Sequence, residues 1–203
     1  MASRMMHYAI SINLAKELNI KDFNSFAIGN LAPDMIGEKH LDYLKSHFIN
    51  TCEQGCSNAI NWVKFIEKYG HKSIDNDFEL GYFVHLISDA YWSDFIQSKY
   101  LSEYPAEIQA DVLEQSYRDL KKCNRPLIQH YAMEYALHSI EMPEIEEINP
   151  SCFEEVIFAL KNDFTNSERD EAHFELFKFG EITEYIEKVT KECVFEVQKL
   201  GHD

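Results

Sequence analysis

Glycine and proline are scarce in this sequence, with seven and five among 203 residues. Alternating apolar and polar runs, the pattern of half-buried strands, are also nearly absent, whereas apolar residues recur at helical spacing. Hydrophobic residues make up 45% of the chain, which excludes a disordered protein. We therefore predict an all-α fold in which residues 1–203 form a single domain, a multi-helix bundle.

Positive charge is the second shortage. The sequence contains 19 Lys and Arg residues and 35 Asp and Glu residues, which gives a formal net charge of −16. Because phosphate contacts to nucleic acids come mainly from Lys and Arg, the composition argues against nucleic-acid binding by a basic patch. A phosphate-bearing substrate would need a local positive centre, which a bound divalent metal ion supplies.

Long apolar runs are missing too. No stretch of about 18 apolar residues could span a bilayer, and the first residues lack the apolar core of a secretory signal. We expect a soluble, cytoplasmic protein that does not span a membrane. The five cysteines are an odd number, which favours reduced thiols. Cys52 and Cys56 are spaced to bind a metal, but no matching second pair exists, so buried thiols are the preferred interpretation.

Apolar periodicity, capping residues and helix breakers predict a series of helices. They run over roughly 3–18, 22–32, 56–69, 77–99, 106–122, 126–140, 151–162 and 182–200. Ser3 is the expected N-cap of the first helix, and Asp75 or Asn76 that of the long central helix. Residues 37–46 are expected to form a polar, flexible connection. Residues 141–203 are expected to contribute helical packing, with the metal-site residues in residues 1–140.

The stretch 80–92 is apolar enough to be buried, yet it contains His85 and Asp89. Four residues apart on a helix, they lie on one face, where an imidazole nitrogen and a carboxylate oxygen can bind the same cation. Gly81, one turn earlier, leaves room for a close neighbour. A buried carboxylate is costly unless it is paired or bound to a metal, so Asp89 must have a partner.

Three residues from other segments are further candidate metal ligands. His7 lies on the apolar stripe of the first helix, where a core histidine is the alternative. Asp34 follows Pro33 in a rigid turn, where a capping role is the alternative. His47 follows the polar connection. Imidazole and carboxylate ligands suit zinc or another first-row divalent ion, with Fe or Mn as alternatives to zinc.

Two weaker features remain. His130, Glu134 and His138 follow one another at four-residue steps, which fits either a solvated helix face or, for His130 and Glu134, additional metal ligands. Trp92 lies seven residues from His85 and so near the same helix face. It is a candidate for an apolar substrate pocket, although a core role is the commoner one for such a residue.

The order of these motifs resembles the zinc-dependent phospholipase C family, which shares its fold with the P1/S1 type nucleases. The motifs are His7, the Gly-Asn-Leu-Ala-Pro-Asp segment ending at Asp34, Ser-His-Phe around His47, and His85-Leu-Ile-Ser-Asp89. The resemblance covers roughly the first half of the chain. It implies that Asp34, His47, His85 and Asp89 bind one zinc ion, and that His7 binds a second ion to which Asp89 bridges.

The same resemblance implies hydrolysis of a small-molecule or lipid phosphate ester by metal-activated water. Asp34 is our candidate for orienting or deprotonating that water. Two departures from the family pattern predict one or two ions rather than three. Met1 stands where family members have an N-terminal tryptophan ligand, and no histidine follows soon after Asp89.

Other functions give weaker matches. A helical phosphohydrolase built on an adjacent His-Asp dyad would have to use His202 and Asp203 at the end of the chain. A di-iron bundle would need Glu-x-x-His pairs, which the sequence lacks. The alternative to an enzyme is a binding or scaffold domain, in which the histidines and acidic residues form hydrogen bonds with one another or hold a structural metal.

Overall fold

The structure of the protein is a computed structural model that describes residues 1–37, 40–49, 59–167 and 173–201. Within these ranges the chain is helical, and its one β pairing is an isolated bridge between Ile49 and Ile60. The predicted all-α class is therefore confirmed. No helix in these ranges is long and apolar enough to cross a membrane. Cys52, Cys56 and the His202–Asp203 dyad lie outside the described residues.

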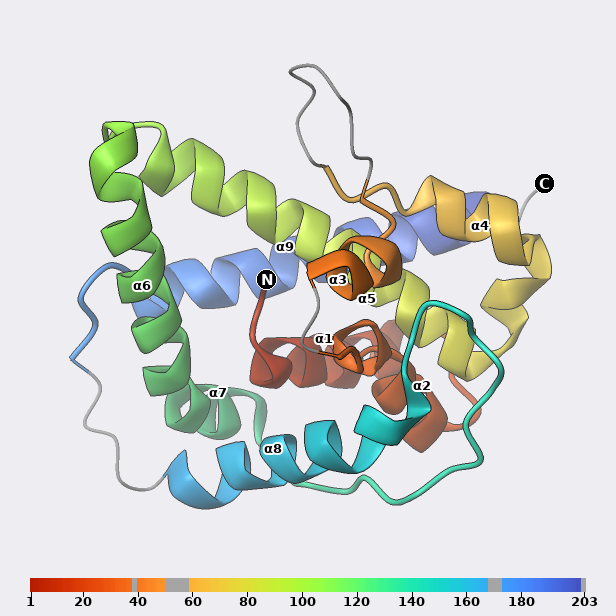
Figure 1. The fold of residues 1–203 in the computed structure, drawn as a ribbon. Coiled ribbons are helices and arrows are strands. Elements are labelled where there is room, and N and C mark those ends of the chain that lie inside the picture. Colours follow the sequence, from red (N-terminus) through yellow and green to blue (C-terminus); the bar gives the residue numbers. More distant parts are fainter. Residues whose placement is uncertain (38–39, 50–58, 168–172, 202–203) are drawn as a thin grey trace.

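Nine α-helices make up the described part of the chain (Figure 1). They are α1 (Arg4–Glu17), α2 (Phe23–Gly29), α3 (His40–Ser46), α4 (Val63–Tyr69), α5 (Asp77–Ile96), α6 (Ala106–Lys122), α7 (Asn124–Tyr131), α8 (Phe153–Asn166) and α9 (Phe179–Leu200). Short 3₁₀ turns lie at η1 (Ala32–Asp34), η2 (His71–Asp75) and η4 (Pro150–Cys152), and a π turn, η3 (Gln97–Leu101), extends α5.

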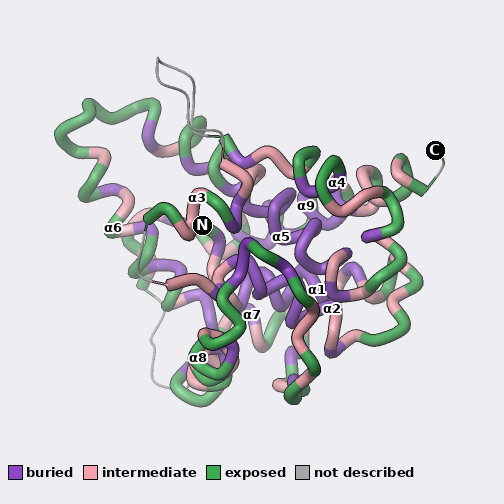
Figure 2. The backbone as a smooth tube through the Cα atoms, turned by 45° about the vertical axis from the view of Figure 1, so that its right-hand side comes forward, coloured by how far each residue is buried: buried purple, intermediate pink, exposed green. Residues whose placement is uncertain are grey.

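Helix α5 is the centre of the bundle. Nearly all of its residues from Phe78 to Asp89 are buried, and Figure 2 shows it surrounded by the other elements. Helix α2 crosses it at very short range because glycines meet there. A Cβ atom on Gly81 would lie 2.1 Å from the Phe26 carbonyl oxygen, and one on Gly29 would lie 2.0 Å from that of Phe78. Helix α9 packs on both α1 and α5.

Side-chain caps explain where the two main helices begin. Ser3 accepts a hydrogen bond from the backbone N–H of Met6, and the Asn76 side chain accepts from those of Phe78 and Glu79. Each satisfies donors that the first helical turn leaves without partners. The predicted cap Ser3 is confirmed, and of the two candidates before α5 the structure uses Asn76.

Residues 37–46 do not form the predicted flexible connection throughout, because α3 occupies His40–Ser46. This short helix is stabilised by tertiary contacts rather than by its own pattern. The Tyr82 hydroxyl donates to the Ser46 carbonyl at 2.6 Å, and the Tyr43 ring packs on that of His47. The prediction for 56–69 is also too long, since α4 begins only at Val63.

The predicted helix over 126–140 is wrong beyond Tyr131. Ala132 takes a left-handed conformation, with φ of 49°, and ends α7. Beyond it the backbone is held in an irregular path by Asn24, whose side chain accepts from the His138 N–H at 3.0 Å and donates to the His138 carbonyl at 3.1 Å. Tertiary hydrogen bonds thus replace the helical ones.

Candidate metal centre

His85 and Asp89 lie one turn apart on α5, and both are completely buried. The close crossing of α2 on α5 brings the turn after α2 to the same place, and with it Asp34 at the end of η1. The space predicted beside Gly81 is therefore filled by the backbone of α2, and this contact is what positions Asp34 near the α5 pair.

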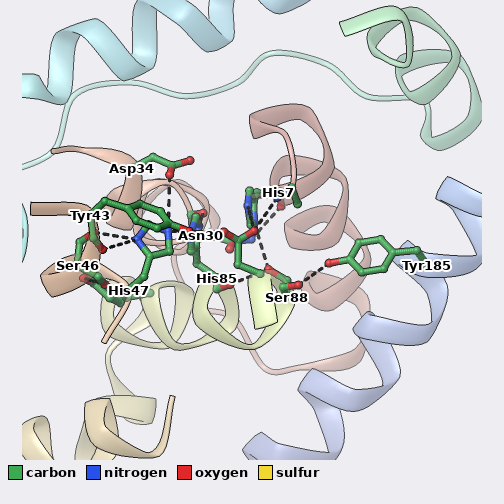
Figure 3. Close-up of polar contacts among 12 residues, drawn as sticks. His7, Asn30, Asp34, Tyr43, Ser46, His47, His85, Ser88 and Tyr185 are labelled. Atoms are coloured by element: carbon green, nitrogen blue, oxygen red, sulfur yellow. Dashed lines mark hydrogen bonds and ion pairs between the residues drawn. The ribbon is translucent and has the colours of Figure 1, made fainter. Parts of the chain in front are cut away.

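Two further histidines complete the group. His7 comes from the first turns of α1 and His47 follows α3 directly, and both are fully buried. Figure 3 shows His47 and Asp34 on one side of His85 and His7 on the other. Donor atoms of His7, His85 and Asp89 lie within 4.8 Å of one another, as do those of Asp34, His47 and His85. All five residues predicted as metal ligands thus come together.

The hydrogen bonds of His85 and His47 define their tautomers. His85 Nδ1 lies 2.9 Å from the Asn30 carbonyl oxygen and His47 Nδ1 lies 3.2 Å from that of Tyr43. A carbonyl only accepts, so each Nδ1 carries a proton, and each neutral ring has a bare lone pair on Nε2. These two Nε2 atoms face each other at 3.1 Å. Two lone pairs at that distance repel, and a shared cation relieves the repulsion.

His7 has the same arrangement. The Ser88 hydroxyl donates to the His85 carbonyl at 2.9 Å and therefore accepts from His7 Nδ1, at 3.2 Å. The Tyr185 hydroxyl from α9 donates to the Ser88 carbonyl at 2.6 Å. His7 Nε2 is buried and has no hydrogen-bond partner. All three imidazoles are thus held by Nδ1, with Nε2 free to bind a cation, which is how metal-ligating histidines are commonly oriented.

The distances between donor atoms fit a small cation. Asp89 Oδ1 lies 3.4 Å from His7 Nε2, and Asp89 Oδ2 lies 3.6 Å from His47 Nε2 and 3.8 Å from His85 Nε2. Asp34 Oδ1 lies 3.8 Å from His47 Nε2. Ligands at about 2.0–2.1 Å around a tetrahedral zinc ion are about 3.3 Å apart. Because its two oxygens face different histidines, Asp89 has the geometry to bridge two ions.

The charge states also suit a cation. Burial alone would raise the pKa of Asp89, but the nearby positive N-terminal amino group opposes it, and that pKa lies well below its ordinary value. Burial, helped by the neighbouring His7, lowers the pKa of His85 well below its ordinary value. The buried pair is therefore a carboxylate and a neutral imidazole, the forms that bind metals. Burial raises the pKa of Asp34.

Several buried polar atoms of the cluster have no partner. Besides His7 Nε2, these are Asp34 Oδ1 and Asp89 Oδ2. Buried polar atoms nearly always form hydrogen bonds, and a group of exceptions in one place calls for a bound species. A divalent cation fits this donor set, since it would take up the free lone pairs of nitrogen and oxygen at once.

Access to the cluster runs past Asp34. Its side chain is 17% exposed, whereas those of His7, His47 and Asp89 are 0% exposed. Asp34 also lines a cavity of about 530 Å³ between the start of α1, α6 and α8. A molecule in this cavity would meet Asp34 before any other member of the cluster.

Three groups around the cluster escaped the sequence analysis. Asn30 accepts from His85 and donates through its side-chain amide to the His7 carbonyl at 2.8 Å, so it ties the two histidines together. Ser88 orients His7, as described above. The backbone N–H of Ala2 donates to Asp89 Oδ1 at 2.7 Å. Ser88 lies three residues after His85 and Asn30 precedes Asp34 by four, but the histidines that they orient, His7 for Ser88 and His85 for Asn30, come from segments far away in sequence.

The weaker candidates lie elsewhere. His130 and Glu134 are both exposed, they are separated by the end of α7, and neither belongs to the cluster. Trp92 is 3% exposed and packs edge-on against Tyr185 and Phe177. It lines a smaller cavity of about 190 Å³, which shares Met1 and Tyr117 with the cavity that Asp34 lines.

Comparisons with known proteins give no family assignment. The chain matches no protein-family model, no curated protein and no solved structure at a significant level. The resemblance to zinc-dependent phospholipases C thus stays a prediction from the motifs.

Proposed function

We propose that this protein is a metal-dependent hydrolase of phosphate esters, with zinc as the preferred ion and iron or manganese as alternatives. One observation carries the proposal: three imidazole Nε2 lone pairs and two carboxylates converge in the core, with three of their donor atoms lacking any hydrogen-bond partner. The ordered motifs that resemble zinc-dependent phospholipases C support the same function.

The donor set fits one or two ions. Asp34, His47, His85 and Asp89 Oδ2 would hold the first, and His7 with Asp89 Oδ1 would hold a second. A divalent ion in such a site supplies Lewis-acid charge for a phosphate oxygen and activates water near neutral pH.

Asp34 is the residue through which the chain itself takes part in the reaction. It is the partly exposed member of the cluster, it lines the cavity, and its buried Oδ1 lacks a partner. A carboxylate at this boundary is placed to orient an attacking water and to accept its proton.

A structural metal site in a non-enzymatic domain is the alternative. The complete burial of His7, His47, His85 and Asp89 favours it, since closed sites are typical of structural ions and catalytic ones keep an open position. The cavity at Asp34 favours the enzyme.

Hydrolysis of p-nitrophenyl phosphate and bis(p-nitrophenyl) phosphate tests the proposal. Activity should disappear with a chelator and return with Zn²⁺ or Mn²⁺, and Asp34→Asn and His47→Ala should each lower kcat/KM by about 100-fold or more. The control is His71→Ala, which changes an exposed histidine in η2. Stoichiometric metal without hydrolysis of either ester would favour the structural site instead.

A further inference from the structure

The wall of the cavity that Asp34 lines contains positively charged side chains, although the protein as a whole is acidic. Besides the start of α1, it is bounded by residues of α6, α7 and α8. Two cations, Arg4 and Lys121, lie in this wall, in a chain whose formal net charge is −16. Arg4 and Lys121 share one carboxylate of this wall, Asp163, and the positive charge left over there indicates that the ligand is an anion.

Arg4 is held in place by the cavity wall. Its Nε and Nη2 each lie 3.0 Å from Asp163 Oδ2, and the Asn124 amide donates to Asp163 Oδ1 at 3.3 Å. These two contacts use two of the five guanidinium N–H groups. Asp163 thus fixes the orientation of Arg4, while donors on the 38% exposed arginine remain free for a ligand.

Lys121 has a different role. It is exposed on the last turn of α6, and its charge acts on the Asp163 carboxylate in the same wall. The neighbouring Lys122, by contrast, is engaged by Asp119 and Glu175. Lys121 therefore adds a second positive charge beside Asp163, on an exposed side chain in the wall of the cavity.

The remaining wall combines apolar residues, such as Leu120 and Met1, with hydrogen-bonding groups. Asn162, Asn166 and Ser167 of the α8 end line it together with Asn124. The side-chain amides can bind phosphoryl oxygens, and the apolar residues leave room for the organic part of an ester.

We propose that this cavity is the substrate subsite of the metal centre and that Arg4 and Lys121 bind the negative charge of its phosphate ester. The inference rests on the proposed function, because it is Asp34 of the metal centre that makes the cavity a substrate site.

Binding of inorganic phosphate tests the subsite without relying on turnover. Phosphate should shift the backbone amide NMR signals of residues in the cavity wall, in zinc-loaded and in chelator-treated protein. Lys121→Gln and Arg4→Lys should each weaken the affinity about three- to tenfold, since each removes one charge-assisted contact to the anion. Lys64→Gln, an equal charge change on the exposed face of α4, is the control and should change nothing.

The outcomes separate this inference from the proposed function. Zinc content measured on the same samples reports on the metal centre alone, and Lys121→Gln should leave it unchanged. The subsite is overturned if both cavity variants bind phosphate like Lys64→Gln, or if phosphate shifts no signal of the cavity wall.

Discussion

Substitution of Gly81 by alanine probes how the bundle positions its metal centre. The new Cβ atom would lie 2.1 Å from the Phe26 carbonyl oxygen and 2.7 Å from the Asn30 nitrogen, both backbone atoms of the α2 segment. Carbon and oxygen atoms pack at well over 3 Å, so the two helices must separate by about 1 Å or more. Neither obstacle is the flexible end of a side chain, and the strain therefore spreads through the helix pair.

We expect Gly81→Ala to lower the free energy of unfolding by about 3 kcal/mol, the upper part of the range for overpacked cores. It should also weaken zinc binding, because His85 lies on α5 and Asp34 lies in the turn that directly follows α2, so both move when the two helices are forced apart. Urea unfolding followed by circular dichroism, with a zinc titration on the folded variant, measures both effects.

The matched control is Gly180→Ala in α9. A Cβ atom there meets nothing within 4 Å, so alanine should be neutral or stabilising by up to about 1 kcal/mol. Equal stability of the Gly81 variant and the wild type would refute the argument that this crossing requires glycine.

Three further predictions concern side chains. Ser88→Ala should lower zinc affinity about 10- to 100-fold, because the His7 ring loses the hydrogen-bond acceptor that orients it. Competition with a chelator measures this change. Unchanged affinity would show that Ser88 does not position His7. Asp119→Asn should destabilise by about 2 kcal/mol or more, since the buried Asp119 carboxylate accepts backbone N–H groups of three consecutive residues before α9; a melting temperature like that of the wild type would contradict it. Arg118 and Lys122 donate hydrogen bonds to the Glu175 carboxylate and lower its pKa to about 2. Because the folded pKa is depressed, this carboxylate stabilises the protein above its ordinary pKa, and the stabilisation is lost as the pH falls towards 2. Glu175→Gln should therefore cost stability at pH 7 and progressively less below about pH 4.5, and a pH-independent difference in urea unfolding would contradict this.

Local signals in the sequence predicted much of the fold. Ser3 and Asn76 cap helices because the cap interaction involves only residues two or three positions away. The pairing of His85 with Asp89 likewise follows from helix geometry alone. The convergence of His7, Asp34 and His47 on that pair came from the resemblance of motifs and not from helix periodicity, because it depends on how distant helices cross.

The predictions that failed depended on tertiary contacts. Helix α7 ends at Ala132, a residue that gives no helix-stop signal, because Asn24 holds the following backbone through hydrogen bonds across 114 positions in sequence. Helix α3 forms in a stretch with too short a pattern to be recognised. The positioning groups Asn30 and Ser88 were missed for the same reason, since their roles become visible only once α1, α2 and α5 are packed together.

The metal content of the purified protein tests the central claim most directly. Protein prepared without added metal should contain at least about one equivalent of zinc, iron or manganese per chain by elemental analysis. His85→Ala should lose most of that metal, and His71→Ala should keep it. Less than about half an equivalent in the wild type, with the same content in the His85 variant, would contradict the metal centre.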